Sequence, residues 1–343
     1  MKHPNFRLLA VGFVFAALLC FTKPESAQAA DKLRLLMDWA FQGQAGAFVN
    51  AVDNGFFASE NLDVSVDRGY GSADAITKLA SGAYDVAFGD INSMMEFNTK
   101  NPDKPQLIAV MMVFDRPPLS IMTFDPSINT PKDLEGKKVV TSQGESNLRL
   151  FPLFAKLNDI DSSKVTFVTV QPQLRESLMM RGEGNAVTGF YYASYESFKA
   201  LGADMPKLKT LMYADYGLKV YGNAIIVSKT LADSKPDVVR RFNLALINSL
   251  RDTMKKPEVV APLLKKRDPT IIEAAETERF EIVNRDFILT PYVKQHGMGD
   301  IDADRMEQGI DQVTKALELP RKPKIEEVFT SKFLPPLNER MLP

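Results

Sequence analysis

The sequence predicts an α/β protein of two lobes, each a sheet flanked by helices, with a cleft between the lobes. Strand–helix units occur in two sets, and the second set is inserted in the first. Each set carries polar, glycine-containing loops where its strands end. Alternating strands and helices are typical of sheets covered by helices, and such sheets bind ligands at the carboxyl ends of strands. We expect lobe 1 to comprise residues 30–124 and 222–343, and lobe 2 to comprise residues 125–221.

Residues 1–29 have the pattern of an export signal. A basic start precedes an apolar core at 8–21, and Ala27-Gln28-Ala29 is a small-x-small cleavage site. Cys20 raises a lipoprotein alternative, but the preceding Leu19 is large where that signal requires a small residue. No later run is long and apolar enough for a membrane helix. We therefore expect a periplasmic protein.

Removing this signal changes which chemistry is available. The chain has one cysteine, which is lost with the signal, and two histidines, of which only His296 remains. The net charge of −1 becomes about two units more negative, because the signal holds three basic residues and one acidic one. A chain that is not basic is not expected to bind nucleic acid. Without cysteine and with one loop histidine, we expect no cofactor, no zinc site and no enzyme.

The first expected strand, 33–37, ends in a polar and aromatic loop at 38–46. This loop contains Trp39, the only tryptophan. The indole can fill the core or stack on a ligand, and both roles stay open. A helix is expected at 47–54, ended by Gly55.

The stretch 69–90 contains a candidate ligand-binding unit. It reads as a loop, a helix that Ser72 caps and Gly82 ends, and a buried strand at 85–89. Two glycines before Ser72 leave the helix N-terminus open to a polar group. The stretch lacks the third glycine of a dinucleotide fingerprint. An ordinary strand–loop–helix without a ligand is the alternative.

The remaining elements repeat this pattern. A second polar loop at 142–147 precedes a helix, in parallel with the loop before Ser72. Two crossings between the lobes, near 124–125 and near 221–223, would form a hinge. Further strands are expected at 61–67, 106–114, 119–123, 138–141, 165–170, 186–190, 208–212 and 224–228, and further helices at 91–98, 174–181, 236–254, 271–287 and 303–317.

Several short motifs, in this order and spacing, resemble a known family. The chain from residue 33 onward resembles periplasmic substrate-binding proteins of ABC importers, in the group that binds thiamine pyrimidine precursors, nitrate, taurine and aliphatic sulfonates. The motifs that carry the resemblance are Asp38-Trp39, Asn54-Gly55-Phe56-Phe57, Leu62-Asp63-Val64, Gly71-Ser72-Ala73-Asp74, Leu79-Ala80-Ser81-Gly82-Ala83-Tyr84-Asp85-Val86-Ala87, Leu134-Glu135-Gly136-Lys137-Lys138-Val139 and Tyr221-Gly222-Asn223.

The resemblance implies a type II-like periplasmic binding fold with the ligand cleft between the lobes. It implies that a monomer captures a small aromatic or heteroaromatic ligand, such as a pyrimidine, by lobe closure. A permease in the inner membrane would then receive the ligand. Trp39 and Tyr191 would stack a flat ring, Ser72 and Ser146 would bind its polar edge, and Asp90 would accept from an amino group. The candidate ligand-binding residues are Trp39, Gln44, Ser72, Asp90, Ser146 and Tyr191.

Three alternatives accompany this interpretation. The first alternative is a sulfonate, taurine or nitrate ligand held by Arg149. It arises because Gln42-Gly43-Gln44 stands where pyrimidine-precursor binders usually have an Asn and a His. The second is a pyrimidine-precursor biosynthetic enzyme of the same fold, which uses its own histidine and iron. The third is a ligand sensor that partners a membrane receptor instead of a permease.

Overall fold

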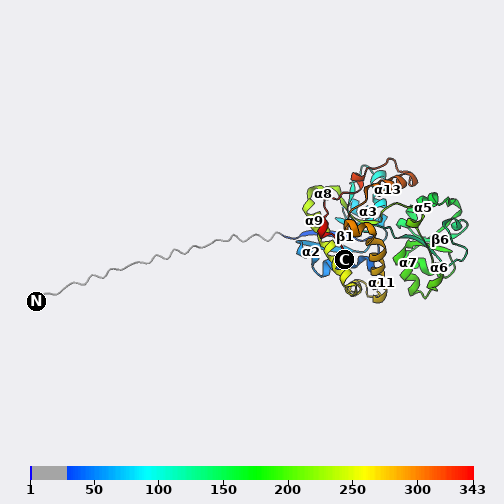
Figure 1. The fold of residues 1–343 in the computed structure, drawn as a ribbon, viewed down its shortest axis with the longest axis horizontal. Coiled ribbons are helices and arrows are strands. Elements are labelled where there is room, and N and C mark those ends of the chain that lie inside the picture. Colours follow the sequence, from blue (N-terminus) through cyan, green and yellow to red (C-terminus); the bar gives the residue numbers. More distant parts are fainter. Residues whose placement is uncertain (2–28) are drawn as a thin grey trace.

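Two lobes lie side by side in the computed structural model, which describes Met1 and residues 29–343 (Figure 1). The predicted export signal falls on residues 2–28, outside the described residues. Among the described helices, none is long and apolar enough to cross a membrane. The prediction of a two-lobed α/β fold is confirmed, because each lobe contains one mixed sheet flanked by helices.

The sheet of lobe 1 has five strands in the order β2-β1-β3-β10-β4. Strand β10 pairs antiparallel with both of its neighbours, whereas β1 is parallel to β2 and to β3. All five residues of β3 are buried, as expected for a strand covered on both faces. The bounds are β1 Asp31–Leu36, β2 Leu62–Asp67, β3 Val86–Asp90, β4 Leu107–Met112 and β10 Asn223–Ser228.

The sheet of lobe 2 has the order β7-β6-β8-β5-β9. It repeats the arrangement of lobe 1, because β6 is parallel to β7 and β8 while β5 runs antiparallel to β8 and β9. Each lobe therefore includes one antiparallel strand next to a crossing between lobes. The bounds are β5 Leu119–Thr123, β6 Lys138–Ser142, β7 Thr166–Val170, β8 Ala186–Phe190 and β9 Lys209–Met212.

The first crossing lies earlier in the chain than the expected boundary at 124–125. Strand β5 pairs in the sheet of lobe 2, so the chain crosses between Met112 and Leu119. The apolar patterns of β4 and β5 are alike and do not reveal which sheet receives each strand. The return crossing, between Met212 and Asn223, includes the expected 221–223.

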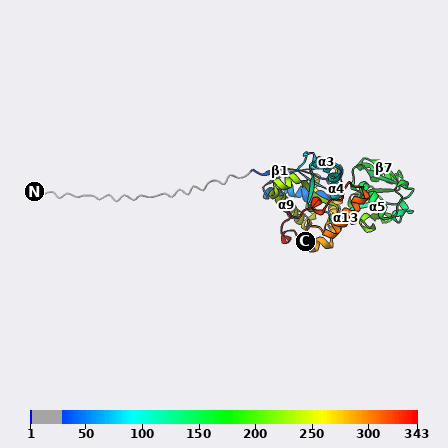
Figure 2. The ribbon, with the colours of Figure 1, turned by 90° about the horizontal axis from the view of Figure 1, so that it is seen from above.

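One arginine of α13 (Ala303–Ala316) forms hydrogen bonds with both crossings. Arg305 donates from Nη2 to the backbone oxygens of Asp115, at 2.5 Å, and Val220, at 3.0 Å. Its guanidinium also lies 4.0 Å from the ring centroid of Tyr221. Because Asp115 and Val220 lie in different crossings, Arg305 holds the two hinge segments together. Helix α13 also contacts α5 of lobe 2 (Figure 2).

Helices cover both sheets and confirm the long helices expected at 236–254 and 303–317. The expected helix at 271–287 is α11 followed by a π-helix at Asn284–Ile288. In lobe 2 the helices are α5 Ser146–Leu157, α6 Arg175–Met180 and α7 Tyr191–Ala200. In lobe 1 they are α1 Gly46–Asp53, α2 Phe56–Ser59, α3 Ser72–Ala80, α4 Ile91–Lys100, α8 Lys229–Ser234, α9 Pro236–Lys255, α10 Val260–Lys265, α11 Glu273–Val283, α12 Pro291–His296, α13 Ala303–Ala316 and α14 Ile325–Val328.

Candidate functional site

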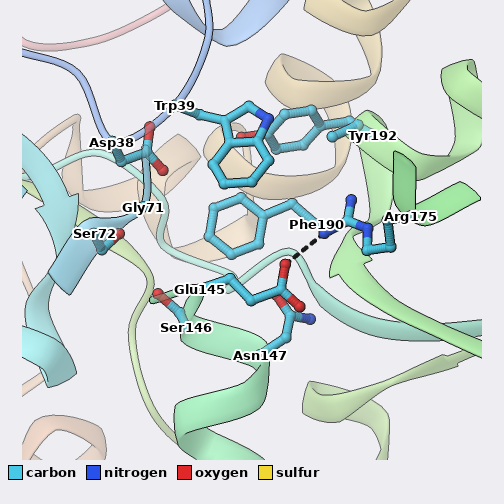
Figure 3. Close-up of a pocket in the computed structure, with 11 residues that line it drawn as sticks. Asp38, Trp39, Gly71, Ser72, Glu145, Ser146, Asn147, Arg175, Phe190 and Tyr192 are labelled. Carbon is cyan, nitrogen blue, oxygen red and sulfur yellow. Dashed lines mark hydrogen bonds and ion pairs between the residues drawn. The ribbon is translucent and has the colours of Figure 1, made fainter. Parts of the chain in front are cut away.

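A small, partly open cavity lies between the two lobes. Lobe 1 supplies the loop after β1 and the start of α3, whereas lobe 2 supplies the starts of α5, α6 and α7 (Figure 3). The lining residues are Asp38, Trp39, Gly71, Ser72, Glu145, Ser146, Asn147, Arg175, Phe190, Tyr192 and Ala193. Three of the six predicted site residues therefore line this cavity: Trp39, Ser72 and Ser146.

Backbone hydrogen bonds hold Asp38 and Trp39 at the carboxyl end of β1. The amide of Gly69 donates to the carbonyl of Trp39 at 2.9 Å, and the amide of Gly71 donates to the carbonyl of Asp38 at 2.7 Å. A Cβ on Gly69 would lie 2.0 Å from the carbonyl oxygen of Met37, so only glycine permits this approach. The loop before α3 thus fixes the aspartate and the indole at the cavity.

Ser72 does not cap its helix, which corrects the prediction. Gly71 occupies the N-cap position, and α3 has no side-chain cap. The Ser72 hydroxyl instead accepts the amide of Asp90 at 3.1 Å, which ties the helix start to the end of β3. Because that oxygen accepts this bond, its own proton is left to donate into the cavity.

The loop before α5 meets the loop before α3 across the cleft. A Cβ on Gly71, whose φ is +125°, would lie 2.9 Å from the carbonyl oxygen of Gly144. Ser72 and Ser146 are the first residues of α3 and α5, so two helix N-termini from opposite lobes face one cavity. This contact shows that the lobes are closed on each other.

Arg175 lies at the lobe 2 wall with its charge neutralised. Its Nη1 donates to Glu145, its Nη2 donates to Glu176 at 2.7 Å, and its Nη2 also donates to Ser194 at 3.0 Å. A Cβ on Gly189 would lie 2.8 Å from Nη2, so a glycine there leaves room for the guanidinium. A buried arginine held by two carboxylates offers no free cation to a ligand.

Glu145 likewise forms its hydrogen bonds within lobe 2. It accepts from Thr141 Oγ1 at 2.8 Å, from Thr188 Oγ1 and from Arg175. Burial raises the pKa of this carboxyl, while the charge of Arg175 opposes the rise.

Asp38 is the carboxylate that keeps an unused acceptor. Its Oδ2 accepts from Asn223 Nδ2 at 2.7 Å, but its buried Oδ1 has no hydrogen-bond partner among the described residues. Burial raises the pKa of Asp38 to about 7, and the bond from Asn223 opposes that rise. A buried acceptor without a partner is costly unless a ligand or water satisfies it.

Two further buried oxygens in the cavity wall lack partners within the described chain: Ser146 Oγ and Asn147 Oδ1. The Asn147 amide nitrogen is fixed by bonds to the carbonyls of Ser120, at 3.0 Å, and Gly189, at 2.8 Å. These bonds orient Asn147 Oδ1 as an acceptor. The cavity therefore presents acceptors from both lobes.

Aromatic rings form the remaining wall. Figure 3 shows the Trp39 indole above Phe190, with Tyr192 beside them. The guanidinium of Arg175 lies 6.0 Å from the Trp39 ring centroid. Tyr192 also packs on Phe114 of lobe 1, with 6.0 Å between ring centroids. Aromatic rings that line a cavity can stack on a flat group.

Three predicted site residues lie outside this cavity. Tyr191 packs on Tyr195, with 5.4 Å between ring centroids, and does not line the cavity. The aromatic residues that line it here are the two neighbours of Tyr191 in sequence, Phe190 and Tyr192. Asp90 caps α4, where it accepts from the amide of Ser93 at 2.8 Å and from Asn92 at 3.0 Å. Burial raises the pKa of Asp90 to about 6, although those bonds oppose the rise.

Gln44 and Arg149 also have other partners. Gln44 lines a separate cavity inside lobe 1 and donates to the carbonyl of Ala40 at 3.1 Å. Arg149 pairs with Glu96 of lobe 1, so the anion anchor considered for it is occupied by a carboxylate of the protein itself.

The sequence reasoning missed Asp38, Glu145 and Arg175 as lining residues. Asp38 stood directly after a strand, in a quoted motif, and that position could have identified it. Glu145 precedes a helix in the second polar loop, a weaker signal. Arg175 comes from α6, and no local pattern connects it with the loop after β1. The ring of His296 stacks on Tyr292. Among the described residues, no cluster of three or more His, Cys, Asp or Glu side chains could hold a metal ion.

Comparisons with known proteins agree with this architecture. Residues 42–259 match the model of a family described as NMT1/THI5 like. The chain is 25% identical over 340 residues to the formylaminopyrimidine-binding protein of Halalkalibacterium halodurans, covering 96% of this chain and 99% of the relative. It is 22% identical over 319 residues to the riboflavin-binding protein RibY of Chloroflexus aurantiacus, covering 91% and 88%.

A solved structure has the same fold. The alkanesulfonate-binding protein SsuA of Xanthomonas axonopodis pv. citri, bound to MOPS, aligns with a TM-score of 0.68 and 15% identity. The alignment covers 88% of this chain and 99% of that protein. At this identity the likeness concerns the fold.

Proposed function

Because this chain belongs to the NMT1/THI5-like family, we propose that it is an exported solute-binding protein that captures an amino-bearing heteroaromatic compound between its lobes. The single observation that carries this proposal is the set of unpartnered oxygens in an aromatic cavity, led by Asp38 Oδ1. A binding role rather than catalysis is the function that we infer from this site.

An aminopyrimidine satisfies each part of the cavity. Its flat ring can pack against Trp39 and Phe190, which line the cavity. Its exocyclic amino group can donate to Asp38 Oδ1 and Asn147 Oδ1, which otherwise stay unsatisfied. Its ring nitrogens can accept from the hydroxyl of Ser72 and from the free amides at the start of α5. The name of the relative from Halalkalibacterium halodurans supports the same ligand class.

The cavity suits a sulfonate or nitrate less well. Both helix N-termini favour an anion, but Asp38 and Glu145 place two carboxyl groups beside them. The one cation in the lining, Arg175, is neutralised by Glu145 and Glu176. A small anion would therefore meet electrostatic repulsion from any ionised carboxylate, with no unpaired cation of the lining to offset it.

Lobe closure would couple capture to delivery. Ligand that contacts Asp38 in lobe 1 and Asn147 in lobe 2 binds the closed form better than the open form and shifts the population toward closure. The closed form would then dock on an ABC permease in the inner membrane.

A binding panel tests the proposed ligand class. We expect 4-aminopyrimidines to raise the melting temperature of the mature protein by mass action, and alkanesulfonates, taurine and nitrate to leave it unchanged. A shift with the sulfonates alone would overturn the proposal. Uptake of a labelled hit by cells that lack this protein separates an importer, whose deletion abolishes uptake, from a sensor, whose deletion leaves transport intact.

A further inference from the structure

A second, larger hollow adjoins the ligand cavity on its outer side. Both spaces are lined by Trp39, Arg175 and Ala193, so they meet at the indole. The outer hollow lies between the lobes, because Gln42 and Arg68 line it from lobe 1, while residues 172, 173, 175–177, 193, 197, 200 and 201 line it from lobe 2. A ligand held in the inner cavity can therefore extend past Trp39 into this outer groove.

Arg68 is the one unneutralised charge among the described residues that line the outer groove. The other two charged residues there, Arg175 and Glu176, pair with each other. The Arg68 guanidinium has no hydrogen bond or ion pair with the described chain, and its Nε is buried without a partner. Its charge helps to lower the pKa of Asp268, but the main causes there are hydrogen bonds from Thr270, and no bond joins Asp268 to Arg68.

The Arg68 side chain is nevertheless positioned. It is partly buried, and its guanidinium stacks on the ring of Tyr70 at 4.8 Å from the centroid. Gln42 lines the same groove, and its buried Oε1 has no partner in the described residues; as an acceptor it can receive a donor of the ligand arm but not the oxyanion. A planar cation held on an aromatic face, with its donors unused, is suited to bind a carboxylate or phosphate through two parallel hydrogen bonds.

We propose that the natural ligand has two parts: a heteroaromatic head in the inner cavity, and an arm that passes Trp39 and ends in an oxyanion bound by Arg68. This inference rests on the proposed function, because the head is the group assigned above to Asp38 and Asn147. It also accounts for both charge environments, since an acceptor-rich inner cavity selects the amino group and a cationic groove selects the anion.

A matched series of synthetic ligands tests the arm. The probes are 4-aminopyrimidines that carry, at ring position 5, an alkyl chain of increasing length ended by a carboxylate or by the neutral carboxamide. Isothermal titration should show one chain length at which the carboxylate binds about tenfold more tightly than the carboxamide, as expected for a charge-assisted bond. Phosphate-ended chains in the same series show which oxyanion is preferred.

The variant Arg68→Gln identifies the residue responsible. We expect it to remove the preference for the carboxylate while the unsubstituted 4-aminopyrimidine binds as before. Arg34→Gln is the matched control, because Arg34 pairs with Asp85 within lobe 1 and lines neither cavity. Equal melting temperatures of the two variants show that both fold.

The outcomes separate the two proposals. If the unsubstituted ring binds but no chain length favours the carboxylate, or if Arg68→Gln keeps that preference, the two-part ligand is wrong and the proposed function stands. If neither the ring nor any extended probe binds, both are wrong.

Discussion

Asp38 is the residue whose chemistry bears most directly on ligand selection. Its position after β1, its buried carboxyl and the bond from Asn223 to Oδ2 leave Oδ1 for a ligand. A ligand that donates to this oxygen favours the carboxylate over the carboxylic acid. Binding therefore lowers the pKa of a group that stands at about 7 in the free protein.

Asp38→Asn should weaken the binding of a 4-aminopyrimidine at least tenfold, because a charge-assisted bond is replaced by a neutral one. At pH 6 the wild type should release up to one proton on binding, since the free carboxyl is then mostly protonated. Calorimetric titration in two buffers of different ionisation enthalpy measures that proton. A variant that binds like the wild type, or binding without proton release, would contradict this role.

The same carboxyl should make the unliganded protein less stable as the pH rises. Its pKa is about 7 when folded and near 3.8 when unfolded, so the folded state holds more protons between these values. The free energy of unfolding should fall across that range by a few kcal/mol and level off above pH 7. Urea unfolding at pH 5 and pH 8 should show a smaller difference for Asp38→Asn, and equal differences would count against the raised pKa.

The residue scale also shows where sequence reasoning ends. Trp39, Ser72 and Ser146 could be predicted because strand ends and helix starts are local patterns. The prediction of Tyr191 was wrong by one position, because the turn from β8 into α7 decides which of three adjacent aromatic rings line the cavity. Arg175 could not be predicted, since its place depends on how α6 packs beneath β8 at Gly189.

At the scale of elements, two glycine loops control how closely the lobes approach. Gly71→Ala should impede closure, because its Cβ would lie 2.9 Å from the Gly144 carbonyl oxygen at a φ of +125°. We expect at least a tenfold loss of ligand affinity. Gly82→Ala is the matched control, since Gly82 also has a positive φ but nothing within 4 Å.

Both glycine variants should lower the melting temperature, because alanine costs about 1–2 kcal/mol in the left-handed region where Gly82 lies. The decrease should be larger for Gly71→Ala, since only glycine commonly adopts its φ of +125° and ψ of 149°. Only Gly71→Ala should lower the affinity measured by titration. Equal affinities of the two variants would show that the contact between the loops does not limit binding.

Element types were largely predictable, whereas their membership in a lobe was not. Strand β3 could be predicted as a short buried run bounded by turn residues, and α9 could be predicted from the helical period of its apolar residues. The π-helix after α11 and the placement of β5 in the second sheet depend on tertiary pairing. The expected boundary therefore came a few residues after the actual crossing.

At the scale of the whole molecule, an ion pair links the lobes on the side of α4 and α5. Arg149 of lobe 2 pairs with Glu96 of lobe 1, which also accepts from Lys100 at 2.8 Å. Because the pair joins the two lobes, we expect opening to break it, so it should favour the closed form before any ligand binds.

Arg149→Met should therefore open the unliganded protein and weaken ligand binding about threefold to tenfold, through the smaller closed population. Small-angle X-ray scattering should give a larger radius of gyration for the unliganded variant, and saturating ligand should restore the wild-type value. Arg34→Met, which breaks an ion pair within one lobe, is the control. Identical scattering from Arg149→Met and the wild type would show that the pair does not bias closure.

The central claim is that an amino-bearing heteroaromatic ring binds beside Trp39, and the chain contains no other tryptophan. Tryptophan emission from the mature protein therefore reports on the inner cavity and the outer groove, both of which the indole lines. Titration with 4-aminopyrimidine should give a saturable change in that emission, and Asp38→Asn should shift the curve to higher concentration. A change produced only by alkanesulfonates, or one that Asp38→Asn leaves unaltered, would contradict the claim.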